Sequence, residues 1–206
     1  MIILSATAEQ HIKDVDKVLT RMRESGVTLN LEKCKWFTRE VEYLGHMVTP
    51  GQLHVHNKNT EALRNAAFPT TKTQLKSFLG MCNVYRRFVK DFTKRARPLN
   101  DLTKKEVPAQ LPKPTNEAIA SFDDLRNVLL SPPILALPKQ GHKFVVDVDA
   151  CADQLGCTLL QEDTNKELHP IGYWSRSLTP AEKNYGTTDR ECLRVVWSVL
   201  KLRHFL

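Results

Sequence analysis

The residues best suited to carry out chemistry are acidic side chains in the second half of the sequence. Asp147 and Asp149 are two residues apart in a stretch that alternates like a β-strand, so both are expected on one face of a sheet. Glu191 falls early in a predicted C-terminal helix. A strand carboxylate and a helix carboxylate that meet at one end of a sheet can hold Mg²⁺, which prefers oxygen ligands. Two such ions about 4 Å apart hydrolyse phosphodiesters by activating water and stabilising the leaving oxygen, which takes about four carboxylates.

Spacing alone leaves a structural alternative open for each of these acids. Thr188 and Glu191 have the spacing of a capping box, in which the glutamate accepts from a backbone N–H at the start of a helix. Such caps are frequent at helix N-termini, so spacing alone favours capping for Glu191. Asp147 and Asp149 can likewise be solvent-facing strand residues. A nuclease is therefore a weak prediction from spacing alone.

Basic residues are concentrated in the first half of the chain, which has a formal net charge of +7 over 206 residues. Met1 to Glu106 contain 19 Lys and Arg against 11 Asp and Glu, whereas Val107 to Leu206 contain 11 against 12. A basic first half indicates a partner that is a polyanion, and nucleic acid is the commonest one. Solvated surface charge is the alternative.

Apolar periodicity predicts the elements of the first half. A helix is expected over residues 9–25 and a short strand over Val27–Leu31. A hairpin is expected from strands at Cys34–Phe37 and Val41–Val48, followed by a short helix at about 57–67.

The most regular helical pattern begins at Thr71, which has capping-box spacing with Gln74. Its apolar side comprises Leu75, Phe78, Leu79, Cys82, Tyr85, Phe88, Val89 and Phe92. If this pattern is one helix, at about 100° per residue, basic residues form a stripe about 60° wide on another side. The candidate phosphate-contacting residues are Lys76, Arg86, Arg87, Lys90 and Lys94. The alternative is an ordinary solvated helix face.

The second half begins with a linker at Lys104–Asn116, which contains three prolines and marks a domain boundary. A helix at 117–130 and strands at 143–149, 156–161 and 170–175 follow. A last helix is expected from about Thr188 onward. Its inward face is expected to hold Cys192, Val195, Val196, Val199 and Leu200. The predicted fold class therefore combines helices and strands: α/β in the broad sense and, more narrowly, α+β.

The chain carries no signal for a membrane or for secretion. It has no run of about 18 apolar residues and no basic leader before its first apolar residues. The five cysteines are scattered and include no C-x-x-C pair, which favours reduced thiols in an intracellular compartment over disulfides or structural zinc.

A series of ordered motifs resembles the polymerase region of gypsy-class long-terminal-repeat retrotransposons. The first-half motifs are Tyr43-Leu44-Gly45-His46, Leu75-Lys76-Ser77-Phe78-Leu79-Gly80, Tyr85-Arg86-Arg87-Phe88, Pro98-Leu99 and Asp101-Leu102. Those of the second half are Phe122 with Leu125, Pro133-Ile134-Leu135, Phe144 with Asp149-Ala150, Gly156, Ser175-Arg176, Leu178-Thr179, Glu182, Asn184-Tyr185 and Glu191. The resemblance covers essentially the whole chain.

The resemblance implies an order of domains. Residues 1–56 resemble the end of a reverse transcriptase palm, and residues 57–106 resemble its thumb and connection, which grips the template–primer duplex. Residues 107–130 form a linker and connecting helix. Residues 131–206 resemble the N-terminal part of an RNase H-like domain.

The resemblance also implies site residues and activity. Asp149 matches the first metal-binding aspartate of the RNase H domain and Glu191 its helix glutamate, both binding Mg²⁺, while Asp147 matches no ligand. Under this resemblance Glu191 is a metal ligand, and a capping role can coexist. The parent activity is RNA-directed DNA synthesis with cleavage of RNA in RNA–DNA hybrids. The implied partners are nucleic acid and the rest of a polyprotein, in the cytoplasm or a virus-like particle, with the nucleus as a further compartment.

Some residues depart from the family pattern. Cys151 stands where a small hydroxyl residue is usual, and Cys157-Thr158 replaces a small apolar pair. The polymerase aspartate pair and two later RNase H aspartates have no counterpart in this sequence, so we expect this chain alone to be inactive. The alternatives are a noncatalytic module that binds RNA–DNA duplexes and a decayed element fragment.

Overall fold

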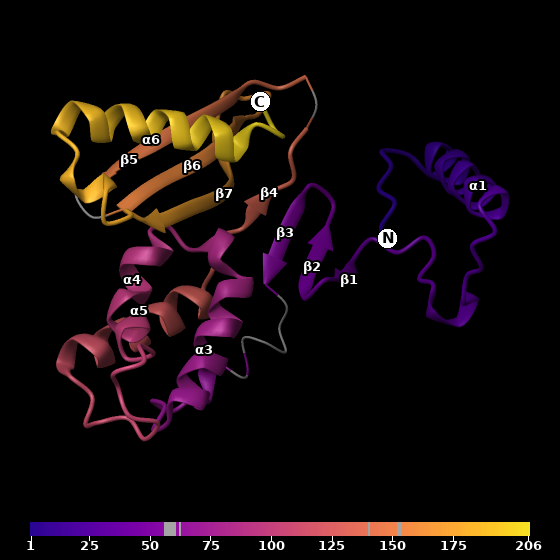
Figure 1. Cartoon of the computed structure of the whole chain (residues 1–206). Coiled ribbons are helices and arrows are strands. Elements are labelled where there is room, and N and C mark those ends of the chain that lie inside the picture. Colours follow the sequence, from indigo (N-terminus) through magenta and orange to yellow (C-terminus); the bar gives the residue numbers. More distant parts are fainter. Residues whose placement is uncertain (56–60, 62, 140, 152–153) are drawn as a thin grey trace.

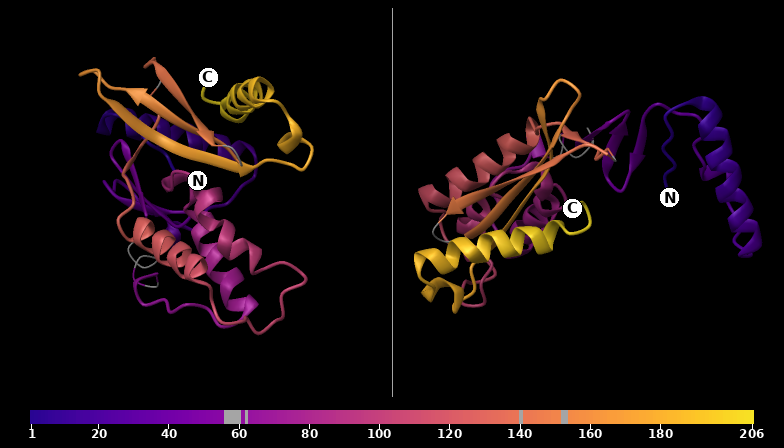
Figure 2. Two further views of the ribbon diagram at one scale, coloured as in Figure 1. Left: turned by 90° about the vertical axis from the view of Figure 1, so that its left-hand side faces the viewer. Right: turned by 90° about the horizontal axis from the view of Figure 1, so that it is seen from above.

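The computed structural model describes residues 1–55, 61, 63–139, 141–151 and 154–206, with only the backbone described at 149–151. Helices and two antiparallel sheets alternate along the chain, which confirms the α+β class. The N-terminal helix lies apart from the rest, and a three-stranded sheet lies between the C-terminal helix and a group of helices (Figure 1). The two further views show the same layering (Figure 2).

Helix α1, Ala8–Glu24, confirms the first predicted helix. The Thr7 side chain accepts from the backbone N–H of Gln10, which satisfies one of the free donors at the helix start. None of the α1 residues is buried. The strand expected at Val27–Leu31 is wrong, because a 3₁₀ turn, η1, occupies Leu31–Lys33 after an Asn30 cap.

A small sheet follows, formed by β1 (Val41–Tyr43), β2 (His46–Thr49) and β3 (Gln52–Val55), with β4 (Leu135–Ala136) added from much later in the chain. The expected pairing of Cys34–Phe37 with Val41–Val48 is wrong. Leu44 and Gly45 both have positive φ, at 49° and 78°, and close a two-residue turn inside the second of those segments. Such a turn matches the twist of its flanking strands, so Val41 pairs with Val48.

The expected single helix from Thr71 is two helices joined by a 3₁₀ turn: α3 (Lys72–Val84), η2 (Arg86–Phe88) and α4 (Phe92–Asp101). The capping box of Thr71 and Gln74 is confirmed. Asp91 adopts φ 57°, a left-handed conformation that Asp tolerates better than most residues, and this turns the chain into α4. The continuous cationic stripe predicted from one helical wheel is therefore wrong.

The proline-containing segment after α4 folds back onto the start of α3. Lys72 N–H donates to the Ala109 carbonyl and Leu111 N–H to the Thr70 carbonyl, each at 2.9 Å. Helix α5 (Asn116–Leu130) then confirms the next predicted helix. The helix expected at about 57–67 lies partly outside the described residues.

One hydrophobic core joins α3, η2, α4 and α5, which we call the helical unit. The core, but not the helical unit, also includes residues of β3 and β4. The largest fully buried members include Leu75, Tyr85, Phe88, Leu99, Leu125, Leu129 and Leu135. The connecting helix α5 thus packs with the segments before the prolines.

The second sheet has the order β5 (Phe144–Cys151), β6 (Gln154–Glu162) and β7 (Leu168–Ser177), which confirms the three predicted strands. Its described strands are all antiparallel, whereas the resemblance implied a mixed sheet. Helix α6 (Thr187–Leu202) covers β5 and β6. A second core beneath it contains Cys157, Leu159, Ile171 and Leu202, with Trp174, Trp197 and Phe205 packed against them.

The orientation of α6 differs from the prediction. Ser198 and Leu202 are its buried residues, whereas Val195, Val196, Val199 and Leu200 are exposed, as is Cys192. Both sides of this helix carry apolar residues, and the side with Trp197 and Leu202 is the one that packs against the sheet.

Candidate nuclease and nucleic-acid site

The end of the sheet where β5 finishes is the end where α6 begins (Figure 1). Asp149 lies in this last part of β5, where its backbone pairs with Gly156 of β6, which pairs in turn with Ser175 of β7. The side chain of Asp149 is outside what the structure describes. Its approach to Glu191 therefore stays a prediction.

Asp147 is exposed and pairs with Thr158. Its neighbour Val146 packs into the core under α6. Because successive side chains of a strand point to opposite faces, Asp147 lies on the face of β5 opposite Val146, the face that the two-residue spacing also predicts for Asp149.

Glu191 is free of the capping role that its spacing with Thr188 suggested. Helix α6 has Gly186 as its N-cap, with no side-chain capping bond, so the third helical residue is Asp189 and Glu191 is the fifth. A capping box needs the glutamate at the third position, so the capping prediction is wrong. Glu191 is exposed and lies within about 20° of the buried Ser198 on the helical wheel, on the side that faces the sheet.

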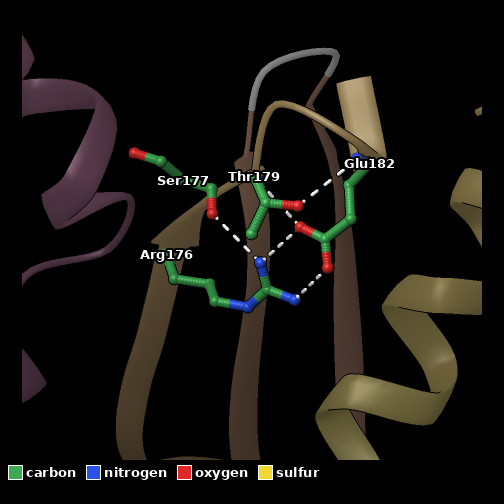
Figure 3. Close-up of polar contacts among 4 residues, drawn as sticks. All are labelled: Arg176, Ser177, Thr179 and Glu182. Carbon is green, nitrogen blue, oxygen red and sulfur yellow. Dashed lines mark hydrogen bonds and ion pairs between the residues drawn. The ribbon is translucent and has the colours of Figure 1, made fainter. Parts of the chain in front are cut away.

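An ion pair holds the segment that leads from β7 into α6 (Figure 3). Two guanidinium nitrogens of Arg176 donate to the two carboxylate oxygens of Glu182, at 2.7 and 2.8 Å. One of these oxygens also accepts from the Thr179 backbone N–H at 2.8 Å. The Arg176 hydrogen bonds, followed by the Thr179 backbone bond, lower the pKa of Glu182 to about 2. This network fixes the entry into the helix that carries Glu191.

The donor set at this end of the sheet suits a hard divalent cation. Asp149 and Glu191 offer carboxylate oxygens, the ligands that Mg²⁺ prefers. Glu191 is exposed, so a cation can reach it from solvent. No thiolate or imidazole is needed for such a site.

The five candidate phosphate-contacting residues divide into two groups. Lys76 lies on α3, Lys90 just before α4 and Lys94 on α4, and all three are exposed. Arg86 and Arg87 lie in η2 and are engaged with the sheet: Arg86 donates to the Ser175 carbonyl at 2.6 Å, and Arg87 lies 4.8 Å from the centroid of the Trp174 ring. The structure leaves the three lysines accessible to a polyanion.

Two of the motifs that carry the family resemblance meet in space. The hydroxyl of Tyr85 donates to the Gly45 carbonyl at 2.6 Å, and the His46 ring stacks on Phe88 with centroids 5.6 Å apart. Burial, and after it the charge of Arg87, lowers the pKa of His46. Sequence reasoning missed this contact, because no spacing rule relates residues about 40 positions apart.

Sequence reasoning also missed a cluster at the turn between β6 and β7. Asp163, Glu167 and His169 place one ligand atom each within 4.8 Å of one another. Asp163 accepts from the backbone N–H groups of Asn165 and Glu167 and contacts His169 Nε2 at 3.1 Å. These bonds shape the turn. The D-x-x-x-E-x-H spacing was its only signal in the sequence.

Two family models match the chain. The model of the RNase H-like domain found in reverse transcriptase matches residues 115–206, and that of reverse transcriptase (RNA-dependent DNA polymerase) matches residues 1–48. Both families are generally dependent on divalent metals. A reverse transcriptase end followed by an RNase H-like sheet and helix defines the class: this is a segment of a reverse transcriptase–RNase H.

Curated relatives cover the whole chain. The Pol polyprotein from transposon opus of Drosophila melanogaster is 35% identical over 214 residues, and that from transposon gypsy is 34% identical over 215. The chain spans 21% and 20% of their lengths. The chain belongs to the Pol polyprotein family of gypsy-class long-terminal-repeat retrotransposons.

Solved structures share the fold. A foamy viral protease-reverse transcriptase in complex with double-stranded DNA superposes with a TM-score of 0.79 at 22% identity, over 98% of this chain and 35% of that one. The foamy viral protease-reverse transcriptase in complex with an RNA/DNA hybrid gives 0.78 at 22% identity, over 97% of this chain and 27% of that one. No helix among the described residues is both long and apolar enough to cross a lipid bilayer.

Proposed function

We propose that this chain joins the two activities of a retrotransposon polyprotein, between the end of the polymerase and the start of the ribonuclease. The parent protein synthesises DNA on an RNA template and cleaves the RNA strand of the resulting RNA–DNA hybrid. The observation that carries this proposal is the order of parts within one chain. A segment matched as reverse transcriptase precedes the helical unit, and a sheet and helix matched as RNase H-like follow it.

In the proposed mechanism, Asp149 and Glu191 hold Mg²⁺ at the end of the sheet where β5 finishes and α6 begins. A Mg²⁺ ion held by these two residues would supply activation of water and stabilisation of the leaving oxygen of the cleaved phosphodiester. Glu191 presents its carboxylate from the exposed start of α6. Arg176 and Glu182 keep that helix start in place.

Lys76, Lys90 and Lys94 are proposed to bind the duplex backbone. Their exposed ammonium groups can reach phosphates without regard to base sequence. The foamy viral structures of the same fold contain double-stranded DNA or an RNA/DNA hybrid, which supports a duplex as the partner. The rest of the polyprotein is the second proposed partner.

The chain by itself supplies two carboxylates of the four or so that two-metal cleavage needs, and it lacks the polymerase aspartate pair. We therefore expect no turnover from the purified chain with Mg²⁺, either in primer extension or in cleavage of a labelled RNA–DNA hybrid. Clear turnover in either assay contradicts this expectation.

A noncatalytic hybrid-binding module is the second candidate function, and it is favoured by the basic first half, which includes the exposed Lys76, Lys90 and Lys94. Binding of an RNA–DNA duplex is then expected to weaken steeply with salt, because each phosphate contact releases counterions. Binding with a flat salt dependence, or no binding, removes this candidate. Fast amide hydrogen exchange throughout the chain would instead indicate a decayed fragment that does not fold.

A further inference from the structure

The free edge of β7 is covered by two arginines of η2. Within the described part of the chain β7 pairs with β6 on one side only, and an unpaired edge leaves backbone groups that need other partners. Arg86 donates to the Ser175 carbonyl at 2.6 Å and Arg87 to the Ile171 carbonyl at 3.4 Å. Two neighbouring residues of the helical unit thus contact the sheet strand four residues apart.

Arg87 is the more deeply inserted of the two. Its guanidinium lies 4.8 Å from the centroid of the Trp174 ring and 6.0 Å from that of Phe205. Both rings pack against the core beneath α6. A guanidinium over aromatic rings gains cation–π attraction, which grows when the group is desolvated. Burial also lowers the pKa of Arg87, the sign of a group withdrawn from water.

The sheet leaves room for this side chain at a glycine. A Cβ added at the buried Gly172 would lie 3.2 Å from Nε of Arg87 and 3.1 Å from the Trp174 ring. These distances are tighter than ordinary contacts, so alanine at this position would force the Arg87 guanidinium and the Trp174 ring to shift by a few tenths of an ångström.

Further polar contacts between the helical unit and the sheet lie close by. The Thr93 backbone N–H donates to the Ser175 hydroxyl at 3.1 Å, and the two hydroxyls are 2.9 Å apart. The amide of the buried Gln154 donates to the Asp91 carboxylate at 2.9 Å. The segment from η2 to the start of α4 is therefore the part of the helical unit that meets β6 and β7.

We propose that Arg87 is a positioning residue that, with Arg86, caps the free edge of β7 and locks the thumb-like helical unit onto the RNase H-like sheet. Neither arginine is a phosphate contact in this assignment. The lock fixes the distance from the lysines that hold the duplex to the acids at the end of β5. This consequence rests on the proposed function, whereas the lock itself does not.

Hydrogen exchange on the full chain without nucleic acid tests the lock. The reporter is the Thr93 amide, whose acceptor lies on β7. Gly172→Ala, which leaves every charge in place, and Arg87→Ala are both expected to speed its exchange about tenfold. Arg87→Lys is expected to behave like Arg87→Ala, because an ammonium lacks the planar fork that stacks and donates. Lys90→Ala is the matched control and leaves the rate unchanged.

The salt dependence of RNA–DNA duplex binding separates the lock from a phosphate contact. Lys90→Ala and Lys94→Ala are each expected to reduce the slope of log K against log salt by about one, and Arg87→Ala to leave it unchanged. The lock is refuted if Gly172→Ala leaves Thr93 exchange unchanged. It is equally refuted if Arg87→Ala lowers the slope by about one and Arg87→Lys restores it. If no variant binds the duplex, the proposed function fails while the exchange experiment still decides the lock.

Discussion

At the residue scale, Arg176 and Glu182 show how an ion pair can be tested through pH. Glu182 is only 14% exposed and has a pKa of about 2 against an ordinary value of 4.5. Because the pKa is lowered in the folded state, the stabilisation is complete above pH 4.5 and is lost as the pH falls towards 2. Glu182→Gln is expected to reduce the free energy of unfolding by about 1 kcal/mol at pH 7, since the pair is partly solvated.

Urea unfolding of both proteins at several pH values checks this expectation. The difference between wild type and Glu182→Gln should shrink between pH 4.5 and pH 2. Glu40→Gln, at an exposed position, is the control and should show no such difference. A difference that stays constant down to pH 2 would show that the carboxylate charge is not what stabilises the segment.

His46 gives a second pH dependence of stability, from a side chain that burial keeps neutral rather than charged. Burial among Tyr85 and Phe88, with the charge of Arg87 nearby, lowers its pKa below the ordinary 6.5. Below about pH 6.5, His46 is therefore protonated in the unfolded chain more readily than in the folded chain. The free energy of unfolding should fall as the pH drops through this range. His46→Gln should flatten this decline, and His204→Gln, at an exposed position, should not. An equal decline in wild type and His46→Gln would contradict this reasoning.

At the element scale, α6 leaves an apolar stripe without a cover in the described part of the chain. Val195, Val196, Val199 and Leu200 are each about half exposed, at 49–62%. Contiguous exposed apolar side chains promote association. The double variant Val196→Gln and Leu200→Gln is expected to lower self-association, measured by sedimentation, while changing the free energy of unfolding by about 0.5 kcal/mol or less.

The matched control for this stripe is Leu202→Gln on the buried side of the same helix. Leu202 has no exposed surface, so a buried amide there should cost about 3 kcal/mol or more. If the double variant destabilises the chain as strongly as Leu202→Gln, the stripe is packed in solution and α6 is oriented otherwise.

Local sequence patterns predicted individual helices and strands well, but they predicted the turns that connect them poorly. Helices α1 and α5 and the three strands of the second sheet follow from apolar periodicity, and the Thr71–Gln74 cap follows from spacing. The apolar pattern did not reveal that helix α3 ends at Val84, because Tyr85, Phe88 and Phe92 enter the same core before, within and after the 3₁₀ turn η2. Periodicity reports which side chains are buried, and a 3₁₀ turn can bury the same ones.

At the scale of the whole molecule, the resemblance assigned roles to acidic and basic residues but indicated nothing about their surroundings. Asp149 and Glu191 were assigned by matching motifs, and the structure adds that Glu191 is free of the helix cap. The engagement of Arg86 and Arg87 with β7 could not be predicted, because their partners lie more than 80 positions away. Contacts between distant segments depend on the packing of whole elements, which no local spacing encodes.

The central claim is that the carboxylates of Asp149 and Glu191 share one divalent cation. Titration of the labelled chain with paramagnetic Mn²⁺, followed by NMR, tests it directly. We expect the amide signals around both residues to broaden together at the same Mn²⁺ concentration, to recover in Asp149→Asn and in Glu191→Gln, and to stay broadened in Asp147→Asn. Broadening at only one of the two positions, or only at the turn of Asp163, Glu167 and His169, would contradict the shared site.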